Sequence, residues 1–171
     1  MCIRDRKMAV EWLIALGHKK IAYIGDCTYE SRYVGYYQTL LTHHIPFDYR
    51  YVHPSTQTEE EGNRIMNDIL KEEDPPTAIF CANDCTALGV LRSLKKGRKK
   101  NYFPSVIAID NIRKSAKTSP MLTTIDIPKQ ELAHFALLLL LDQQKKAHKE
   151  CVRIELPCRL IERDSCTYAP S

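Results

Sequence analysis

The amino-acid sequence predicts an α/β protein in which a largely parallel sheet is covered by helices on both faces. Two observations lead to this fold class. Helical and extended segments alternate from Lys7 onward, and most extended segments are short apolar runs separated by turn residues. With 171 residues, of which 44% are hydrophobic and 27% charged, the chain can bury a sizeable core as one domain.

The first half of the chain contains three predicted helices and two predicted strands. A helix that ends at Gly17 precedes the apolar strand 21–25, and a second helix over 31–43 precedes an extended segment at 49–53. The best-marked helix start lies at 58–61, where a threonine hydroxyl and a glutamate carboxylate can satisfy free backbone amides.

The second half continues the alternation and ends in a more exposed strand. Two prolines at 75–76 interrupt the chain before a strand, and Asn83 can cap the helix that follows. Pro128 suits the first turn of a long helix because its missing N–H is not needed there. Apolar and charged residues alternate over 152–156, which predicts a half-exposed strand. The elements predicted here are strands at 78–81, 106–109, 123–127 and 152–156 and a helix from 128 to about 146.

Charge and hydropathy argue against several classes of protein. The formal net charge of +4 is mild and acidic residues occur throughout, so charge alone indicates no nucleic-acid surface. The one strongly apolar run, 135–141, is too short to cross a bilayer, so we expect no membrane partner. Residues 1–6 lack the apolar stretch of a secretory signal, and we interpret them as a non-native or disordered leader. We therefore expect a cytoplasmic protein.

The seven cysteines lack the paired close spacing of a zinc site or a disulfide scaffold. We expect free thiols, with Cys81 and Cys85 as small buried hydrophobic residues rather than metal ligands. The basic run 95–100 lies between a helix and a strand, which favours a solvated connection over a phosphate-binding site. Nucleophile, metal and cofactor motifs are absent, so the sequence predicts neither an enzyme nor a bound cofactor or metal.

Polar residues follow each of the first four predicted strands. In open parallel sheets, ligands bind beyond the carboxyl ends of the strands because loops and helix N-termini converge there. Short carboxylates, carboxamides and hydroxyls suit a polyhydroxylated ligand, whose hydroxyls both donate and accept hydrogen bonds. The same residue types cap helices, so each position taken alone fits either role. The polar segments are 26–28, 53–56, 83–84 and 110–111.

Arg32 differs from these positions because a cation in the first turn of a helix lies at the unfavourable end of the helix dipole. Its guanidinium needs compensating partners. These could be ligand oxygens bound in pairs, or Asp26, Glu30 or solvent. The local sequence leaves these alternatives open.

Six segments resemble LacI/GalR regulators in their order and approximate spacing, over about residues 7–165. A single motif such as AND-x-x-A-x-G is weak, but six segments in the family's order make a specific match. The segments are GHKKIAYIG, RYVGYYQTLL, PTAIFCANDCTALGVLRSL, VIAIDNI, SPMLTTIDIP and LPCRLIERDS.

The resemblance implies a periplasmic binding protein type I-like fold, in which two α/β lobes enclose a sugar cleft. Residues 7–127 would then form the C-terminal lobe, and 128–149 would be a helix of an incomplete, largely missing N-terminal lobe. Residues 150–165 would be the return strand of the C-terminal lobe, followed by a tail at 166–171. The helical stretch 137–141 is apolar all round, which suits burial on several sides.

The resemblance also implies the site and the partners. The family's sugar contacts would fall on Arg32, Asn83 and Asp110, with Thr28 as a weaker candidate, and these side chains must then share one hollow. The family often has an aromatic platform near Gln57, which this chain lacks, so the identity of the sugar stays open. Operator DNA would be bound through a helix-turn-helix absent from this chain, by a homodimer of the full-length protein.

Two other classes of protein remain as alternatives. A periplasmic sugar-binding protein of a transport system shares the bilobed fold and the polar strand ends, but it needs a secretory signal upstream. A doubly wound α/β enzyme needs a catalytic motif. The regulator-like segments GHKKIAYIG and LIERDS favour the sugar-binding domain of a DNA-binding transcriptional repressor.

Overall fold

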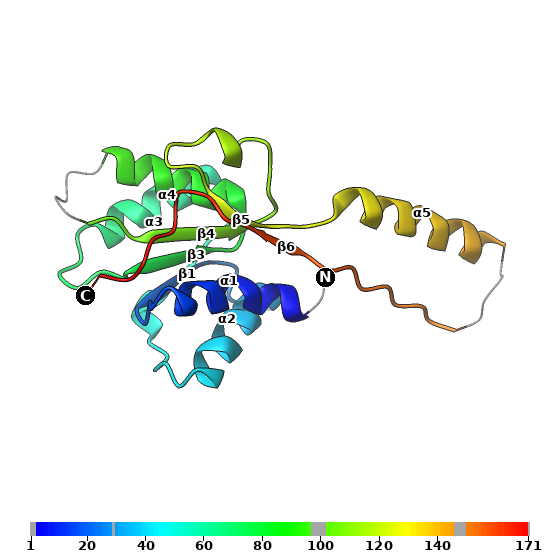
Figure 1. The fold of residues 1–171 in the computed structure, drawn as a ribbon, viewed down its shortest axis with the longest axis horizontal. Coiled ribbons are helices and arrows are strands. Elements are labelled where there is room, and N and C mark those ends of the chain that lie inside the picture. Colours follow the sequence, from blue (N-terminus) through cyan, green and yellow to red (C-terminus); the bar gives the residue numbers. More distant parts are fainter. Residues whose placement is uncertain (1–2, 29, 97–101, 146–149, 171) are drawn as a thin grey trace.

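A computed structural model of the chain describes residues 3–28, 30–96, 102–145 and 150–170. Six strands form one sheet in the order β2-β1-β3-β4-β5-β6. Figure 1 shows α1 and α2 on one face of this sheet and α3 and α4 on the other. The strands are β1 (Ile21–Gly25), β2 (Val52–Pro54), β3 (Ala78–Cys81), β4 (Ser105–Ile109), β5 (Thr123–Asp126) and β6 (Arg159–Ile161). The helices are α1 (Ile3–Ala15), α2 (Ser31–Thr42), α3 (Glu59–Ile69), α4 (Asp84–Lys96) and α5 (Lys129–Gln144), with short 3-10 turns η1 (Tyr49–Tyr51) and η2 (Ser115–Lys117).

The sheet is mostly parallel, as the sequence predicts. Strands β1 to β5 pair in parallel, and β6 pairs antiparallel with β5, Thr124 lying opposite Ile161. The chain leaves β1 toward β2 on one side and returns to β3 on the other, so the strand order reverses at β1. Ligands of open α/β sheets bind at such a reversal, beyond the carboxyl ends of the strands.

Two apolar clusters hold the helices on the sheet. Tyr23, Tyr36 and Phe80 lie in the cluster under α1 and α2, while Met66 and Ile79 lie in the cluster under α3 and α4. Each residue of β1, β3 and β4 is buried, because helices cover both faces of these strands. This double burial explains why the strands read as continuous apolar runs.

The predicted helix ends are formed by the residues that the sequence indicates. Gly17 follows α1 with a φ of 90°, a left-handed conformation that favours glycine. Thr58 Oγ1 accepts a hydrogen bond of 3.2 Å from the backbone N–H of Glu61 at the start of α3. The Glu61 carboxylate binds Arg64 instead of reaching back, so only half of the capping box forms.

Four sequence predictions about local structure are wrong. Helix α1 begins at Ile3, so the leader at 1–6 is helical from its third residue, and residues 1–2 lie outside the described residues. The segment expected to be a strand at 49–53 opens with the 3-10 turn η1, whose Asp48 cap fixes the backbone before β2. The expected strand at 152–156 does not form, and pairing with β5 begins only at Arg159. Cys85 is exposed on α4, whereas Cys81 is buried as predicted.

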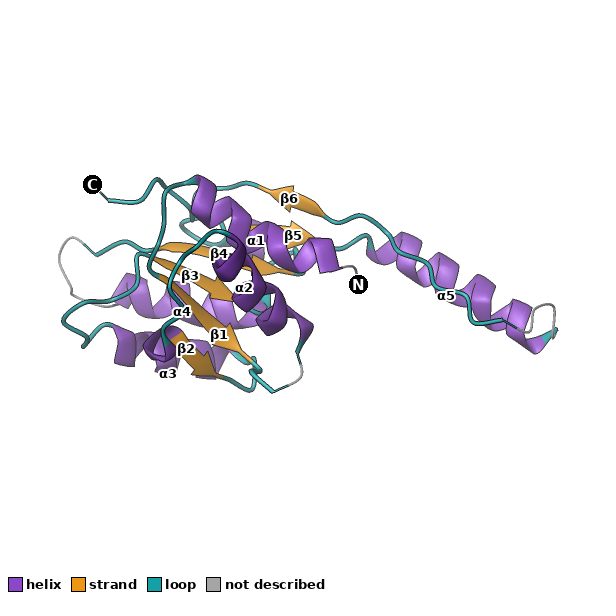
Figure 2. Cartoon of the chain, turned by 90° about the horizontal axis from the view of Figure 1, so that it is seen from below, coloured by secondary structure: helices purple, strands orange, loops and turns teal. Residues whose placement is uncertain are grey.

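The failure at 152–156 has a simple cause. An alternating pattern makes a strand only where a neighbouring strand offers backbone partners, and β5 ends at Asp126, before it can reach this segment. Figure 2 shows α5 and the segment that returns from it extending away from the sheet. No residue of α5 is buried, and the side chains of Leu137 and Leu140 are 58% and 63% exposed. No helix of the described residues has the length and apolar character needed to span a membrane.

His18 joins the C-terminal segment to the amino-terminal ends of β3 and β4. The ring is buried, Nε2 donates to the Thr167 carbonyl at 3.0 Å and lies 2.9 Å from Ser105 Oγ, and Nδ1 lies 3.0 Å from Thr77 Oγ1. Burial lowers the pKa of His18 below its usual value, and the bond to Thr167 opposes this only in part. The folded protein therefore disfavours the charged ring.

We expect the free energy of unfolding to fall between pH 7.5 and pH 5.5. Because the pKa of His18 is lower in the folded state, the unfolded chain takes up the proton first. The contribution is thus present above pH 6.5, the usual histidine value, and is lost as the pH falls below it. His53 acts in the same direction, since burial also lowers its pKa. Urea unfolding at both pH values checks this, with His43→Asn, an exposed position, as the control. Equal or greater stability at pH 5.5 contradicts it.

Candidate functional site

Polar side chains gather where the parallel strands end. Arg32 lies in the first turn of α2, directly after the loop from β1, and its side chain is only 15% exposed. Its Nη1 donates to Glu30 Oε1, and its Nη2 lies 3.6 Å from Asp110 Oδ1, beyond the end of β4. Two carboxylates therefore compensate the charge of the guanidinium. Of the partners that the sequence leaves open for Arg32, the structure shows Glu30.

Glu30 extends this set of contacts to the loop after β2 and, through Gln57, to the end of β3. Its Oε2 accepts a hydrogen bond of 2.9 Å from Gln57 Nε2 and another of 3.3 Å from the Tyr23 hydroxyl. The backbone carbonyl of Gln57 in turn accepts a bond of 3.1 Å from Asn83 Nδ2. Arg32, Asp110, Glu30, Gln57 and Asn83 thus form one continuous set of contacts, which we call the strand-end network. It brings together the three principal residues predicted from the sequence.

Asn83 also has the capping role that the sequence predicts. Its Oδ1 accepts bonds of 2.8 Å from both the backbone N–H and the hydroxyl of Thr86, at the start of α4. These bonds fix the orientation of its amide group at the end of β3. Thr28 lies elsewhere: its side chain is exposed, and its hydroxyl donates to Asp26 rather than to the network.

Asp110 occupies a strained position of the backbone. Its φ is 125°, and that of Asn111 is 50°, both in the left-handed region that side chains other than glycine rarely adopt. Burial raises the pKa of Asp110, and the nearby Arg32 guanidinium opposes that rise. Lys129, at the start of α5, donates from Nζ to the Asp110 carbonyl oxygen. In this backbone conformation the Asp110 carboxyl lies beside Arg32.

One buried hydrogen-bond donor of the network has no acceptor in the described part of the chain. Arg32 Nε is buried and has no hydrogen-bond partner among the described residues. An unsatisfied buried donor costs stability unless another group supplies an acceptor. The network thus contains a buried donor that no acceptor of the described residues satisfies.

Sequence reasoning missed Gln57 and Lys129 as members of this region. Gln57 has a φ of 63° in the loop after β2, and no local pattern indicates that its side chain turns toward Glu30. Lys129 carries one visible signal, since it is a cation in the first turn of a helix, as Arg32 is.

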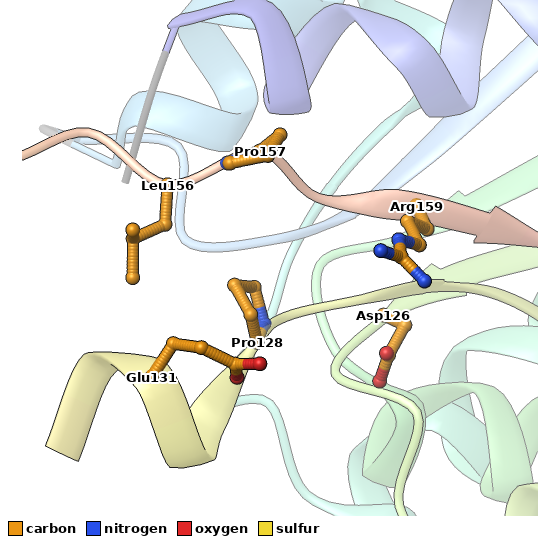
Figure 3. A pocket seen from close by; sticks show the side chains of 6 residues that line it. All are labelled: Asp126, Pro128, Glu131, Leu156, Pro157 and Arg159. Atoms are coloured by element: carbon orange, nitrogen blue, oxygen red, sulfur yellow. The ribbon is translucent and has the colours of Figure 1, made fainter. Parts of the chain in front are cut away.

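A small cavity lies beside this region, between the start of α5 and β6. It has a volume of about 200 Å³ and is lined by Asp126, Pro128, Glu131, Leu156, Pro157 and Arg159. In Figure 3 the Asp126 and Glu131 carboxylates and the Arg159 guanidinium surround it. Asp126 links it to the neighbouring loop by accepting a bond of 2.9 Å from Asn111 Nδ2. Within the described ranges, no cluster of three His, Cys, Asp or Glu side chains could hold a metal ion.

These features place the chain in a class of protein that contains an open α/β lobe with a polar edge at its strand reversal. One long connection leaves β5 and another leads into β6. A family profile described as a periplasmic binding protein-like domain matches residues 10–166. The chain therefore belongs to the periplasmic binding protein-like domain family, and it corresponds to the effector-binding region of LacI-type regulators.

Relatives of known name support this assignment. The chain is 37% identical over 169 residues to the HTH-type transcriptional repressor CytR of Escherichia coli K12, covering 95% of this chain and 49% of the repressor. It is 33% identical over 168 residues to the repressor PurR of Photorhabdus laumondii, with the same coverage. A LacI family regulator from Enterococcus faecium, solved with bound ribose, has a TM-score of 0.87 and 29% identity over 98% of this chain and 64% of its own.

The chain thus spans about half the length of the curated relatives it matches. Both curated relatives are transcriptional repressors, neither transport proteins nor enzymes, so the transporter and enzyme alternatives gain no support from them.

Proposed function

We propose that this chain is the effector-binding domain of a LacI/GalR-type DNA-binding transcriptional repressor, and that its effector is a sugar or sugar derivative. The observation that carries the proposal is the strand-end network. Five polar side chains from the ends of four parallel strands converge there, in a family whose E. faecium member was solved with ribose. The domain is not an enzyme and needs no cofactor.

The network suits a polyhydroxylated ligand because it offers donors and acceptors side by side. A sugar hydroxyl can accept from the Arg32 guanidinium and donate to the oxygens of Glu30 or Asp110. Neighbouring hydroxyls can bind the planar guanidinium and a carboxylate together. We assign effector contact to Arg32, Asn83 and Asp110, with Lys129 at the rim and Thr28 outside the network.

The lobe organisation follows from the same proposal. Residues 7–127 form the C-terminal lobe, the helix at 128–149 belongs to the N-terminal lobe, and 150–165 return to the first lobe before the tail at 166–171. Residues 146–149, like the basic run from 97 onward, lie outside the described residues. Operator DNA would be contacted by a helix-turn-helix outside this chain, in a cytoplasmic homodimer. An effector that binds both lobes would shift their relative angle and so the spacing of the DNA-reading heads.

Binding to the isolated chain tests the site. We expect weak, millimolar binding of at least one neutral sugar, because this chain carries the contacts of only one lobe, and we expect Arg32→Ala to reduce the affinity at least tenfold. Calorimetric titration with ribose, glucose and cellobiose measures both effects. Arg50→Ala, which removes an exposed arginine of η1, is the matched control and should bind as the wild type does. Equal affinity of the wild type and Arg32→Ala would refute the assignment of this site.

The exposed helix gives a second test, of the lobe assignment. If α5 packs inside another lobe, its leucines should form an exposed apolar surface in this chain. We expect the wild type to bind a hydrophobic dye and to scatter light, and Leu137→Gln with Leu140→Gln to reduce both signals. The free energy of unfolding should change by less than about 0.5 kcal/mol, because neither side chain packs on the body of the protein. A loss of stability of several kcal/mol would show that α5 is packed within this chain.

A further inference from the structure

Glu30 has an unusual position for a carboxylate at the start of a helix. It precedes α2 as its N-cap residue, yet its side chain makes no capping hydrogen bond to the helix backbone. Both oxygens turn into the strand-end network, Oε1 toward Arg32 and Oε2 toward Gln57 and Tyr23. The side chain is only 15% exposed. Its negative charge is therefore committed to the site rather than to the helix end.

The positive charge of the Arg32 guanidinium is therefore already balanced by carboxylates. Glu30 binds one of its terminal nitrogens, and Asp110 lies 3.6 Å from the other. Both terminal nitrogens thus lie beside a carboxylate, and the buried Nε has no hydrogen-bond partner among the described residues. A guanidinium flanked by two carboxylates can still donate to a neutral hydroxyl, whereas a phosphate at the same place would lie beside both negative charges.

The wider charge balance points the same way. Six carboxylates lie at or next to this edge of the sheet, and four cations accompany them among the described residues. The carboxylates are Asp26, Glu30, Asp84, Asp110, Asp126 and Glu131, and the cations are Arg32, Lys129, Arg159 and Arg163. A phosphate group would add about two further negative charges beside Glu30 and Asp110. Juxtaposed like charges are a strong means of rejecting a ligand.

We propose that Glu30 is a specificity-determining residue that restricts the effector to uncharged polyhydroxyl molecules and rejects their phosphorylated forms. The inference rests on the proposed function and deepens it, because it names the chemical class that the same site accepts. A neutral hydroxyl can donate to the Glu30 carboxylate and accept from the Arg32 guanidinium. A dianionic phosphate group has no O–H to donate to Glu30 and adds negative charge beside it.

Paired sugars test this inference on the 171-residue chain. The probes are ribose against ribose 5-phosphate and glucose against glucose 6-phosphate, titrated at low ionic strength so that screening does not mask the charge effect. The variants are the wild type, Glu30→Gln, which keeps the size of the side chain and removes its charge, and the control Glu11→Gln, which removes an exposed charge of α1. Backbone amide shifts in two-dimensional NMR report binding even in the millimolar range.

We expect the wild type and the control to bind a neutral sugar at least tenfold more tightly than its phosphate. In Glu30→Gln this preference, measured as the ratio of the two affinities in the same variant, should shrink at least fivefold. If wild type and Glu30→Gln discriminate equally, or if the wild type binds both forms alike, the role of Glu30 is refuted while the sugar site stands. If no sugar of either kind shifts the amides around Arg32 and Asp110, the proposed function itself fails and the inference with it.

Discussion

Replacing Asp84 by alanine should lower the free energy of unfolding by about 3 to 5 kcal/mol. The side chain is fully buried and accepts three hydrogen bonds: from the Ile112 N–H at 2.8 Å, the Ser115 hydroxyl at 2.5 Å and the Thr124 hydroxyl at 2.6 Å. Alanine leaves all three donors without this partner in a site that water does not reach. Urea unfolding, followed by circular dichroism, measures the loss.

Asp74→Ala is the matched control, since it removes an aspartate whose partner, Lys20, lies on an open surface. An exposed ion pair of this kind is screened by solvent, so the unfolding midpoint should stay close to that of the wild type. Asp84→Ala with the stability of the wild type would contradict the account of the loop that carries Asp110, because Asp84 joins that loop to α4 and β5.

Gly89→Ala should cost about 2 kcal/mol. A Cβ at Gly89 would lie 1.9 Å from the Glu59 carbonyl oxygen and 2.7 Å from the Asn63 backbone nitrogen, so α3 and α4 must move apart. Overpacking against backbone atoms costs about 3 kcal/mol, and the better helix propensity of alanine returns up to about 1 kcal/mol. Thermal and urea unfolding of the variant check the net effect.

The control for Gly89→Ala is Cys85→Ala on the exposed side of the same helix, where only helix propensity changes. It should be neutral or slightly stabilising. If Gly89→Ala behaved like this control, the close approach of α3 and α4 would be wrong. Gly62→Ala should resemble Gly89→Ala, because its Cβ would lie 2.1 Å from the Thr86 carbonyl oxygen.

Most of the fold could be predicted because its signals are local. Apolar runs flanked by turn residues mark β1, β3 and β4, and Gly17, Thr58 and Asn83 mark helix ends that the structure confirms. The alternation at 152–156 misled because a strand needs a neighbour, and pairing is a property of the sheet rather than of the segment. The antiparallel direction of β6 likewise depends on where the chain re-enters the sheet.

The site was predictable to a lesser degree. Strand order decides which polar ends meet, and the rule for parallel sheets grouped the strand ends that carry Asn83 and Asp110, whereas Arg32 was added by the resemblance to LacI/GalR regulators. Gln57 joins them through a left-handed backbone conformation that its sequence neighbours do not indicate. Asp84 shows the opposite error: it follows Asn83 in a segment predicted to bind ligand, yet its carboxylate is used entirely within the protein.

Side-chain NMR of Arg32 tests the central claim most directly. A neutral sugar titrated into the chain should shift the Arg32 Nε–H and Asn83 Nδ2 signals along one binding curve, while the Asn67 Nδ2 signals, from α3, stay in place. Sugar binding that moves signals around Arg159 and leaves those of Arg32 and Asn83 unchanged would contradict the account.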